Sequence, residues 1–162
     1  MEQQLKDLIQ KMTLNEKIGQ LLQLATPFFK GASNKGEITG PMAGMGISED
    51  VSQNCGSVLG ASGAREVINI QNAHLEENRL GIPLLMMADI VHGFKTIFPV
   101  PLAIGCTWDL GLAEKSAEVA AKEAAVSGVH VTFAPMVDLV RDPRWGRNEE
   151  CYGEDAYFNG TM

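Results

Sequence analysis

Apolar residues recur every three or four positions at the amino end of the chain, from Leu5 to Met12, which predicts an amphipathic helix. Thr13 and Glu16 follow with the spacing of a capping box, in which each side chain accepts a hydrogen bond from the other residue's backbone N–H. A second helix should therefore begin directly after Thr13 and continue up to Leu22. The chain is expected to start with two helices.

Beyond this region, short apolar runs alternate with longer helical segments. Strands are predicted over residues 57–60, 82–88 and 129–135, and helices over residues 64–78 and 110–126. The run over 82–88 is apolar on both faces, the pattern of a parallel strand that is covered on each side. Strands that alternate with helices predict parallel pairing with right-handed crossovers, and hence an α/β architecture.

The number of strand–helix units limits the fold. A closed barrel needs eight units and typically ~250 residues, whereas this chain offers about two and a half units. Residues 154–159 have the pattern of a helix beginning, and the sequence stops at Met162 before one full amphipathic repeat. The pattern leaves open a small open sheet or part of a barrel. The abrupt end favours the first part of a TIM-like (β/α) barrel with parallel strands, truncated before closure.

Residues 27–56 have no sustained period and are rich in glycine, with prolines at positions 27 and 41. Such a segment predicts an excursion over the surface rather than a part of the core. We therefore expect a Gly-rich surface loop over 27–56, within one partial amino-terminal barrel domain over 1–162.

Charge and composition restrict the partners. The chain holds 13 Lys and Arg against 20 Asp and Glu, a net charge of −7 with a pI near 4.9, and 45% of its residues are hydrophobic. This balance is typical of a globular domain and lacks the basic surface that nucleic acid or anionic lipid requires. We expect no nucleic acid and no membrane as partners, and a neutral substrate instead.

The amino terminus mixes charged and apolar residues from its second position, unlike a secretory signal peptide. After the first predicted strand, the longest uncharged apolar stretch covers residues 96–108. It is broken by Pro99 and Pro101 and is shorter than the ~20 residues that a membrane-spanning helix requires. A cytoplasmic location is expected.

The three cysteines, Cys55, Cys106 and Cys151, are odd in number and far apart. They form neither a disulfide framework nor the close pairs of a structural zinc site, so buried or idle thiols are expected. The sequence also lacks the motifs of serine hydrolases, nucleotide hydrolases and zinc proteases. It indicates no cofactor and no metal.

Ligands of parallel α/β folds bind at the carboxyl ends of the strands, so a polar residue that directly follows an apolar run is a candidate. Asp89 follows the run over 82–88, and its carboxylate can accept hydrogen bonds from two neighbouring sugar hydroxyls. The alternative is that Asp89 caps a turn or pairs with a basic side chain. His92 is placed to orient that carboxylate, although a structural role is the simpler interpretation.

A second candidate region follows the strand over 129–135. Three arginines and five carboxylates lie between Arg141 and Asp155, a density that predicts an ion-pair web holding an irregular loop. Most of these charges are expected to be scaffolding. An arginine left facing the strand ends could donate to hydroxyl oxygens, and Trp145 offers an apolar face for a sugar. Glycoside hydrolysis needs two carboxyl groups, and the sequence singles out no pair.

Several stretches of the chain carry specific motifs. They are Met12–Leu21, Ile82–Gly93 followed by Phe98-Pro99 and Trp108-Asp109, Ala134–Asp138, and Arg141–Arg147 followed by Glu150 and Glu154-Asp155. Together they resemble the amino-terminal part of glycoside hydrolase family three, in particular its bacterial β-glucosidases. The last stretch is the most specific, because D-P-R-W-G-R followed at these distances by E and E-D scarcely arises by chance.

This resemblance implies a retaining exo-glycosidase that removes terminal β-linked sugars, with a TIM-related barrel followed by a second α/β sandwich domain. Asp89 matches the family's aspartate that binds hydroxyls of the terminal non-reducing sugar, and Arg147 matches a second binder of that sugar. The family's nucleophile and acid/base fall beyond Met162, so no catalytic residue is assigned. The family also uses a Lys-His pair, which does not occur in this chain, and Ala156 stands where proline is usual.

The expected function is that of a β-glucosidase fragment that supplies part of the site for terminal non-reducing β-D-glucosyl residues. Its partners would be β-glucosides or short β-linked oligosaccharides, and the missing carboxy-terminal part of the barrel with the second domain. Without that part the chain is expected to be poorly stable and inactive. Three alternatives stay open: a non-catalytic small α/β carbohydrate-binding module, a β-xylosidase of the same family, and a structural subunit completed by a separate chain.

Overall fold

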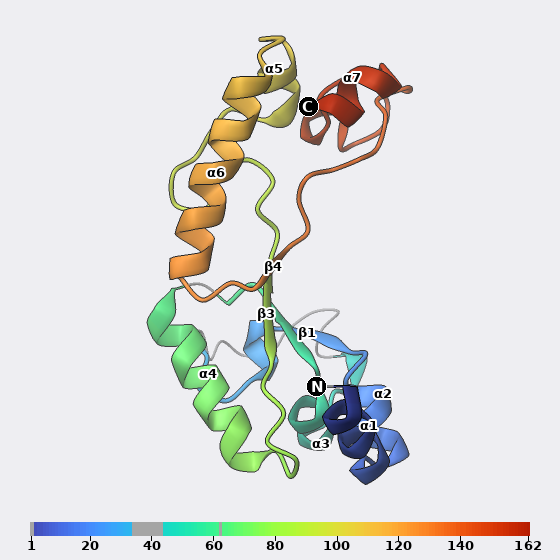
Figure 1. Cartoon of the computed structure of the whole chain (residues 1–162), viewed down its shortest axis with the longest axis vertical. Coiled ribbons are helices and arrows are strands. Elements are labelled where there is room, and N and C mark those ends of the chain that lie inside the picture. Colours follow the sequence, from blue (N-terminus) through green and yellow to red (C-terminus); the bar gives the residue numbers. More distant parts are fainter. Residues whose placement is uncertain (1, 34–43, 62) are drawn as a thin grey trace. The chain divides into compact units, whose positions relative to one another are not determined.

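The computed structural model describes residues 2–33, 44–61 and 63–162. The chain divides into two compact units, whose helices and strands are labelled in Figure 1. The first unit comprises Met1–Met87 and Gly128–Val131, and the second comprises Ala88–Ser127 and Thr132–Met162.

A parallel sheet organises the first unit. Strand β1 (Gln23–Ala25) pairs with β2 (Ser57–Leu59), and β2 pairs with β3 (Leu85–Ala88), in both cases in parallel. The short strand β4 (Val131–Thr132) completes the order β1-β2-β3-β4. Within the described residues this four-stranded sheet is open. The predicted α/β fold with parallel strands is thereby confirmed.

The strand register brings three apolar side chains into one row. Leu24 of β1 lies beside Val58 of β2, which lies beside Met86 of β3. All three are buried, and the exposed fractions of Val58 and Met86 are only 0% and 1%. Ile70 of helix α4 (Ala64–Glu77) belongs to the same hydrophobic core. The apolar run that predicts a covered strand therefore lies in the middle of this core.

Helices α1 (Glu2–Lys11) and α2 (Leu14–Gly19) confirm the two predicted amino-terminal helices. The capping box is present, because the N–H of Glu16 donates to the Thr13 hydroxyl at 3.3 Å and the N–H of Thr13 donates to the Glu16 carboxylate at 2.7 Å. The expected continuation of α2 to Leu22 is wrong, since the helix ends sooner and the chain then enters β1.

Close backbone packing explains where α2 ends. A Cβ on Gly19 would lie 2.3 Å from the carbonyl oxygen of Asn54, and a Cβ on Gly56 would lie 2.3 Å from that of Gln20. The N–H of Gly56 also donates to the carbonyl oxygen of Gly19 at 3.0 Å. Both glycines let the chain after α2 approach the segment that leads into β2. Pairing with β2 thus outweighs the helical periodicity of the sequence.

The segment predicted as a Gly-rich surface loop, 27–56, differs from that expectation where the structure describes it. Its first part overlaps the short helix η1 (Thr26–Phe28), and its last part contains helix α3 (Glu49–Asn54). Phe29 is buried in the core. Residues 34–43 lie outside the described residues, so the surface loop stays a prediction for them.

Helices α5 (Pro101–Gly105), α6 (Leu110–Val126) and α7 (Ala156–Thr161) belong to the second unit. The bounds of α6 are those predicted from the sequence. The carboxylate of Asp109 caps α6 by accepting a hydrogen bond from the N–H of Gly111 at 2.9 Å. In Figure 1, α5 and α7 lie near the beginning of α6.

Tight contacts hold the loop that precedes α7 in place. A Cβ on Gly105 of α5 would lie 2.1 Å from the carbonyl oxygen of Tyr152, so α5 packs directly on the backbone of this loop. The rings of Trp108 and Phe158 lie 4.4 Å apart between centroids. The loop also contains the short helix η3 (Asn148–Glu150). It carries the arginine-rich sequence singled out above.

All three cysteines are free. Cys55 and Cys151 are buried, whereas Cys106 is exposed. Burial raises the pKa of both buried thiols. Across residues 2–33, 44–61 and 63–162, no helix has the length and apolar character needed to cross a membrane.

Candidate functional site

Asp89 stands directly after β3, in the second unit. Its neighbours Ala88 and Ile90 are buried, and the carbonyl oxygen of Ala88 accepts a hydrogen bond from the N–H of Phe133 at 3.2 Å. Because successive side chains of an extended segment point to opposite sides, this anchoring turns Asp89 outward, and the residue is exposed. Among the described residues, none donates a hydrogen bond to the Asp89 carboxylate. Its oxygens are therefore available to a ligand.

His92 contacts the backbone of its own loop rather than the Asp89 carboxylate. Its Nδ1 lies 2.9 Å from the carbonyl oxygen of Phe98, which can only accept, so Nδ1 carries a proton and donates. The N–H of Phe98 donates in return to the carbonyl oxygen of His92 at 2.8 Å. This reciprocal pair fixes the imidazole, and the structural interpretation of His92 fits it better than an orienting contact with Asp89.

Helix α6 holds the loop that carries His92. The carboxylate of Glu123 accepts hydrogen bonds from the N–H groups of Lys95 and Thr96, both at 2.8 Å, and from the Thr96 hydroxyl at 2.6 Å. These bonds, foremost that of the Thr96 hydroxyl, lower the pKa of Glu123. Gly93, with a φ of 114°, makes the turn that brings the chain back. The loop after β3 is thus fixed to α6.

The arginine-rich segment forms local ion pairs instead of the expected web. Asp142 accepts from Nε and Nη2 of Arg144 at 2.9 and 2.6 Å, and Glu150 accepts from Nε and Nη2 of Arg147 at 2.9 and 2.5 Å. Both contacts join the side of the guanidinium to two carboxylate oxygens. They differ in exposure, since the Arg144 side chain is 89% exposed and that of Arg147 is 48% exposed.

The charges of two further carboxylates, besides that of its hydrogen-bond partner, also act on Arg147. Its pKa is raised first by the hydrogen bonds to Glu150, and further by the negative charges of Glu150, Asp89 and Asp138. For Arg144, the group that raises the pKa is Asp142. Asp89 and Arg147, the two sugar binders expected from the sequence, therefore lie within electrostatic reach of each other.

A buried amide, that of Asn159, and a half-buried one, that of Asn148, brace the segment around Arg147. Nδ2 of Asn159 donates to the carbonyl oxygen of Asp138 at 3.2 Å, and its Oδ1 accepts from the N–H of Tyr152 at 3.1 Å. Nδ2 of Asn148 donates to the carbonyl oxygen of Asp142 at 3.1 Å. These bonds join backbone positions that are far apart in the loop, so they restrict the irregular segment without regular secondary structure.

The arrangement brings hydrogen-bond donors and acceptors within electrostatic range of one another. Arg147 donates Nε–H and one Nη2 hydrogen to Glu150, which leaves Nη1 and the second Nη2 hydrogen for a ligand. Asp89 and Asp138 are exposed and supply acceptor oxygens. A compound with several hydroxyl groups can accept from the guanidinium and donate to the carboxylates at once. No group of three or more His, Cys, Asp or Glu suited to a metal ion occurs in the described residues.

Sequence reasoning did not select Asp138 or Glu150 as site residues. Asp89 follows β3 directly, whereas Asp138 lies in the loop beyond the end of β4, so its position gives only a weak signal in the sequence. Glu150 follows Arg147 by three residues, the spacing of one short helical turn. Trp145 is half-buried, and its face stays a predicted surface for a sugar.

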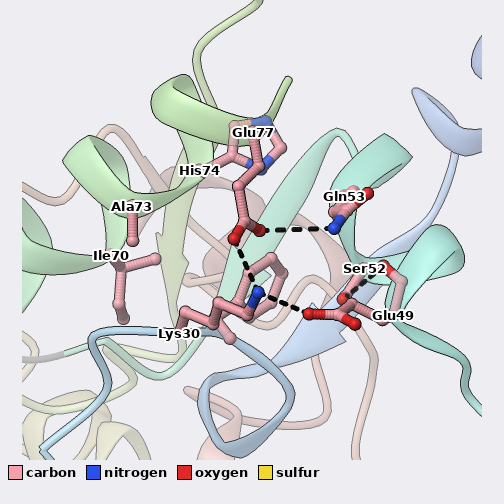
Figure 2. Close-up of a pocket in the computed structure, with 9 residues that line it drawn as sticks. Lys30, Glu49, Ser52, Gln53, Ile70, Ala73, His74 and Glu77 are labelled. Atoms are coloured by element: carbon pink, nitrogen blue, oxygen red, sulfur yellow. Dashed lines mark hydrogen bonds and ion pairs between the residues drawn. The ribbon is translucent and has the colours of Figure 1, made fainter. Parts of the chain in front are cut away.

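A separate hollow lies in the first unit, beside α3 and α4 (Figure 2). The ammonium of Lys30 lies between the carboxylates of Glu49 and Glu77, and Gln53 donates to Glu77 at 3.3 Å. Nearby, His74 is buried, and burial lowers its pKa. One ammonium thus pairs with two carboxylates, and through these ion pairs Lys30 joins the chain after η1 to helices α3 and α4.

Comparison with known proteins leads to one family. The family model described as "Glycosyl hydrolase family 3 N terminal domain" matches residues 13–162 of the chain. The chain is 36% identical over 156 residues to a periplasmic beta-glucosidase of Salmonella typhimurium, covering 96% of this chain and 19% of that protein. It is 30% identical over 155 residues to a putative beta-xylosidase of Formosa agariphila, covering 93% and 18%. The chain thus spans about a fifth of the length of these relatives.

Solved structures give the same result. The beta-glucosidase of Listeria innocua in complex with glucose superposes with a TM-score of 0.92, at 51% identity over 99% of this chain and 22% of that one. Its complex with isofagomine superposes with a TM-score of 0.89, at 50% identity and the same coverage. These matches confirm the predicted fold class, an α/β fold that forms the first part of a TIM-like barrel.

Proposed function

Since this chain belongs to glycosyl hydrolase family 3, we propose that it supplies part of the sugar site of a retaining, exo-acting β-glucosidase. The bound group is the terminal non-reducing β-D-glucosyl residue of a β-glucoside or a short β-linked oligosaccharide. The beta-glucosidase of Listeria innocua, half of whose aligned residues are identical to this chain, has been solved with glucose, which supports this choice of ligand.

The observation that carries the proposal is the environment of the Arg147 guanidinium. One side of it is held by Glu150, and the negative charge of Asp89 acts on it from the exit of β3. A sugar bound here would receive hydrogen bonds from the free edge of the guanidinium and give hydrogen bonds to Asp89. Because both protein groups are charged, each bond is stronger than one between neutral groups, with a net value of roughly 1.5–3 kcal/mol.

The groups that break the glycosidic bond lie outside this chain in our proposal. Retaining hydrolysis needs a nucleophile and an acid/base about 5–5.5 Å apart. The resemblance implies that both fall beyond Met162. Asp89 and Arg147 contribute by binding: they hold the terminal ring so that its anomeric carbon faces the nucleophile. The 162-residue chain alone is therefore expected to be inactive, and without the rest of the barrel it is expected to be poorly stable.

Titration of the protein with glucose, followed by NMR or calorimetry, tests the binding role. Arg147→Met removes every donor while keeping an unbranched side chain, and Asp89→Asn removes the charge with little change of shape. Each substitution is expected to weaken glucose binding at least about tenfold, as loss of one charged hydrogen bond implies. The matched control is Arg144→Met, because Arg144 has the same side-on ion pair in the same loop but not the charge of Asp89 nearby.

Unchanged glucose affinity in both Arg147→Met and Asp89→Asn would contradict the proposed site.

An assay with a chromogenic β-glucoside tests whether the groups that hydrolyse the substrate lie outside this chain. Turnover by the purified 162-residue chain, at a rate that is lost in Asp89→Asn, would show that the chemistry is performed within these residues after all.

A β-xylosidase is the second candidate, because one relative at 30% identity is named a putative beta-xylosidase. Glucose and xylose differ by one hydroxymethyl group, so parallel titrations with both sugars separate the two candidates. Tighter binding of xylose would favour the xylosidase. A cooperative, glucose-stabilised unfolding transition of this chain by itself would favour the carbohydrate-binding module. The expected cytoplasmic location remains a prediction.

A further inference from the structure

We propose that Glu150 is a positioning residue, which holds the guanidinium of Arg147 so that its free edge faces the sugar and stays apart from Asp89. This inference rests on the proposed function of Arg147 and adds to it a residue that acts through Arg147.

The contact between the two side chains is built into one turn of the chain. The N–H of Glu150 donates to the carbonyl oxygen of Arg147 at 3.1 Å, within helix η3. The next residue, Cys151, is fully buried and donates its N–H to the carbonyl oxygen of Asn148 at 3.3 Å. The backbone on both sides of Glu150 is therefore fixed. Its carboxylate returns over Arg147 and accepts from Nε and Nη2.

Fixing the guanidinium before the sugar arrives favours binding. A free arginine side chain populates many rotamers, and a ligand must stop this motion when it binds. The bond to Glu150 restrains the side chain in advance, as in other pre-organised sites. The Glu150 side chain itself is only 24% exposed, so water competes with this ion pair less than at an open surface.

Glu150 also determines which carboxylate pairs with the guanidinium of Arg147. Asp89 and Asp138 attract the same guanidinium through their charges. If Arg147 were free to move, it would pair with one of them and occupy the acceptor oxygens that a sugar needs. Because Arg147 is already paired side-on with Glu150, it does not pair with Asp89. The carboxylate oxygens of Asp89 then remain available to the sugar.

His92 supports the charge of Glu150. The pKa of Glu150 is lowered first by the hydrogen bonds from Arg147 and also by the charge of His92. His92 is held by its reciprocal bonds with Phe98, and that loop is held by Glu123 of α6. The carboxylate of Glu150 is thus bonded to the guanidinium that it orients and is within electrostatic range of a fixed imidazole.

The pair formed by Arg144 and Asp142 provides an internal comparison. It has the same side-on geometry, but its arginine is almost fully exposed, and within residues 2–33, 44–61 and 63–162 Asp142 is the one group that raises the pKa of Arg144. Removing the carboxylate from this pair should therefore leave sugar binding unchanged, whereas removing it from the Arg147 pair should not.

A double-mutant cycle in the full protein, with glucose as the probe, tests the inference. Glu150→Gln is expected to weaken glucose binding about tenfold in the native background. In the Arg147→Met background the same substitution should have no further effect, because Glu150 then has nothing to orient. Asp142→Asn should bind glucose as the native protein does. If Glu150→Gln does not fold, Glu150→Asp, which withdraws the carboxylate by one methylene, takes its place with the same expectations.

An NMR signal reports directly on the ion pair between Arg147 and Glu150. The Nε–H resonance of Arg147 should be observable and slow to exchange in the native protein, and lost in Glu150→Gln but not in Asp142→Asn. Native-like glucose affinity of Glu150→Gln, or an equal loss in both backgrounds, would overturn the inference while the binding role of Arg147 stands. If Arg147→Met binds glucose normally, or the native protein binds none, the proposed function fails and this inference with it.

Discussion

Thr96 gives both of its donors to one carboxylate, that of Glu123 on α6: its hydroxyl at 2.6 Å and its N–H at 2.8 Å. The neighbouring Lys95 adds a third donor. In Glu123→Gln one acceptor oxygen becomes an amide donor, so these bonds cannot all form. We expect the N–H groups of Lys95 and Thr96 to exchange with deuterium about tenfold faster, as measured by exchange mass spectrometry.

Glu118→Gln is the matched control for that measurement. Glu118 lies on the same helix and pairs with Lys115 and Lys122, so its substitution removes an exposed carboxylate without touching the loop. Unaltered exchange at Thr96 in Glu123→Gln would mean that α6 does not hold the loop.

Gly105→Ala is expected to weaken glucose binding although it lies outside the sugar site. The new methyl would stand 2.1 Å from the carbonyl oxygen of Tyr152, so α5 and the loop with Arg147 must separate. Overpacking of this kind costs about 1–3 kcal/mol of stability. Thermal unfolding and a glucose titration measure the two effects.

The control is Gly160→Ala in α7, where an added methyl meets open space. Alanine favours a helix over glycine, so this variant should be at least as stable as the native chain. Native stability and affinity in Gly105→Ala would show that α5 does not support the site.

Stability of the first unit should fall in acid because of Glu16. Hydrogen bonds from Arg79, at 2.8 and 2.7 Å, are the main reason that the pKa of Glu16 is lowered from 4.5 to about 2. A lowered pKa means that folding favours the ionised form. Its stabilising contribution is therefore complete above the unfolded-state pKa of 4.5, and is lost as the pH falls toward about 2.

Urea unfolding between pH 2 and 7 measures this dependence, in the native chain and in Glu16→Gln. The substitution should flatten the profile below about pH 4.5, whereas Glu114→Gln, at an exposed position of α6, should not. An NMR titration that gives Glu16 an ordinary pKa would contradict the expectation.

The three thiols should react at different rates. Cys106 is exposed, whereas Cys55 and Cys151 have exposed fractions of 0% and thiol pKa values raised by burial. Because the thiolate is the reactive form, an alkylating reagent should modify Cys106 first in the folded chain, and all three in denaturant. Mass spectrometry of the intact chain counts the additions, and Cys106→Ser should abolish the fast one. Fast modification of Cys55 would indicate that the core around β2 opens.

Local signals in the sequence were sufficient for the longer elements. The predicted helices over 64–78 and 110–126 correspond to α4 and α6, because each has a sustained period and clear ends. The strand around Met86 was predicted from its length and apolar character. Asp89 could be selected because its polar side chain interrupts that run.

Elements that depend on distant contacts could not be predicted in this way. Strand β1 has three residues, and it exists because the glycines at 19 and 56 let it pair with β2. The difference between Arg144 and Arg147 is of the same kind. Both have a carboxylate within three residues, and only the folded chain brings the charges of Asp89 and Asp138 to one of them.

The ion pair of Arg147 and Glu150 is encoded within four consecutive residues. Insertions or deletions elsewhere in this loop can therefore change its length without separating the two side chains. One residue inserted between Arg147 and Glu150 would rotate the Glu150 carboxylate away from the guanidinium. Length variation among related sequences should accordingly be excluded from this one turn and tolerated on either side of it.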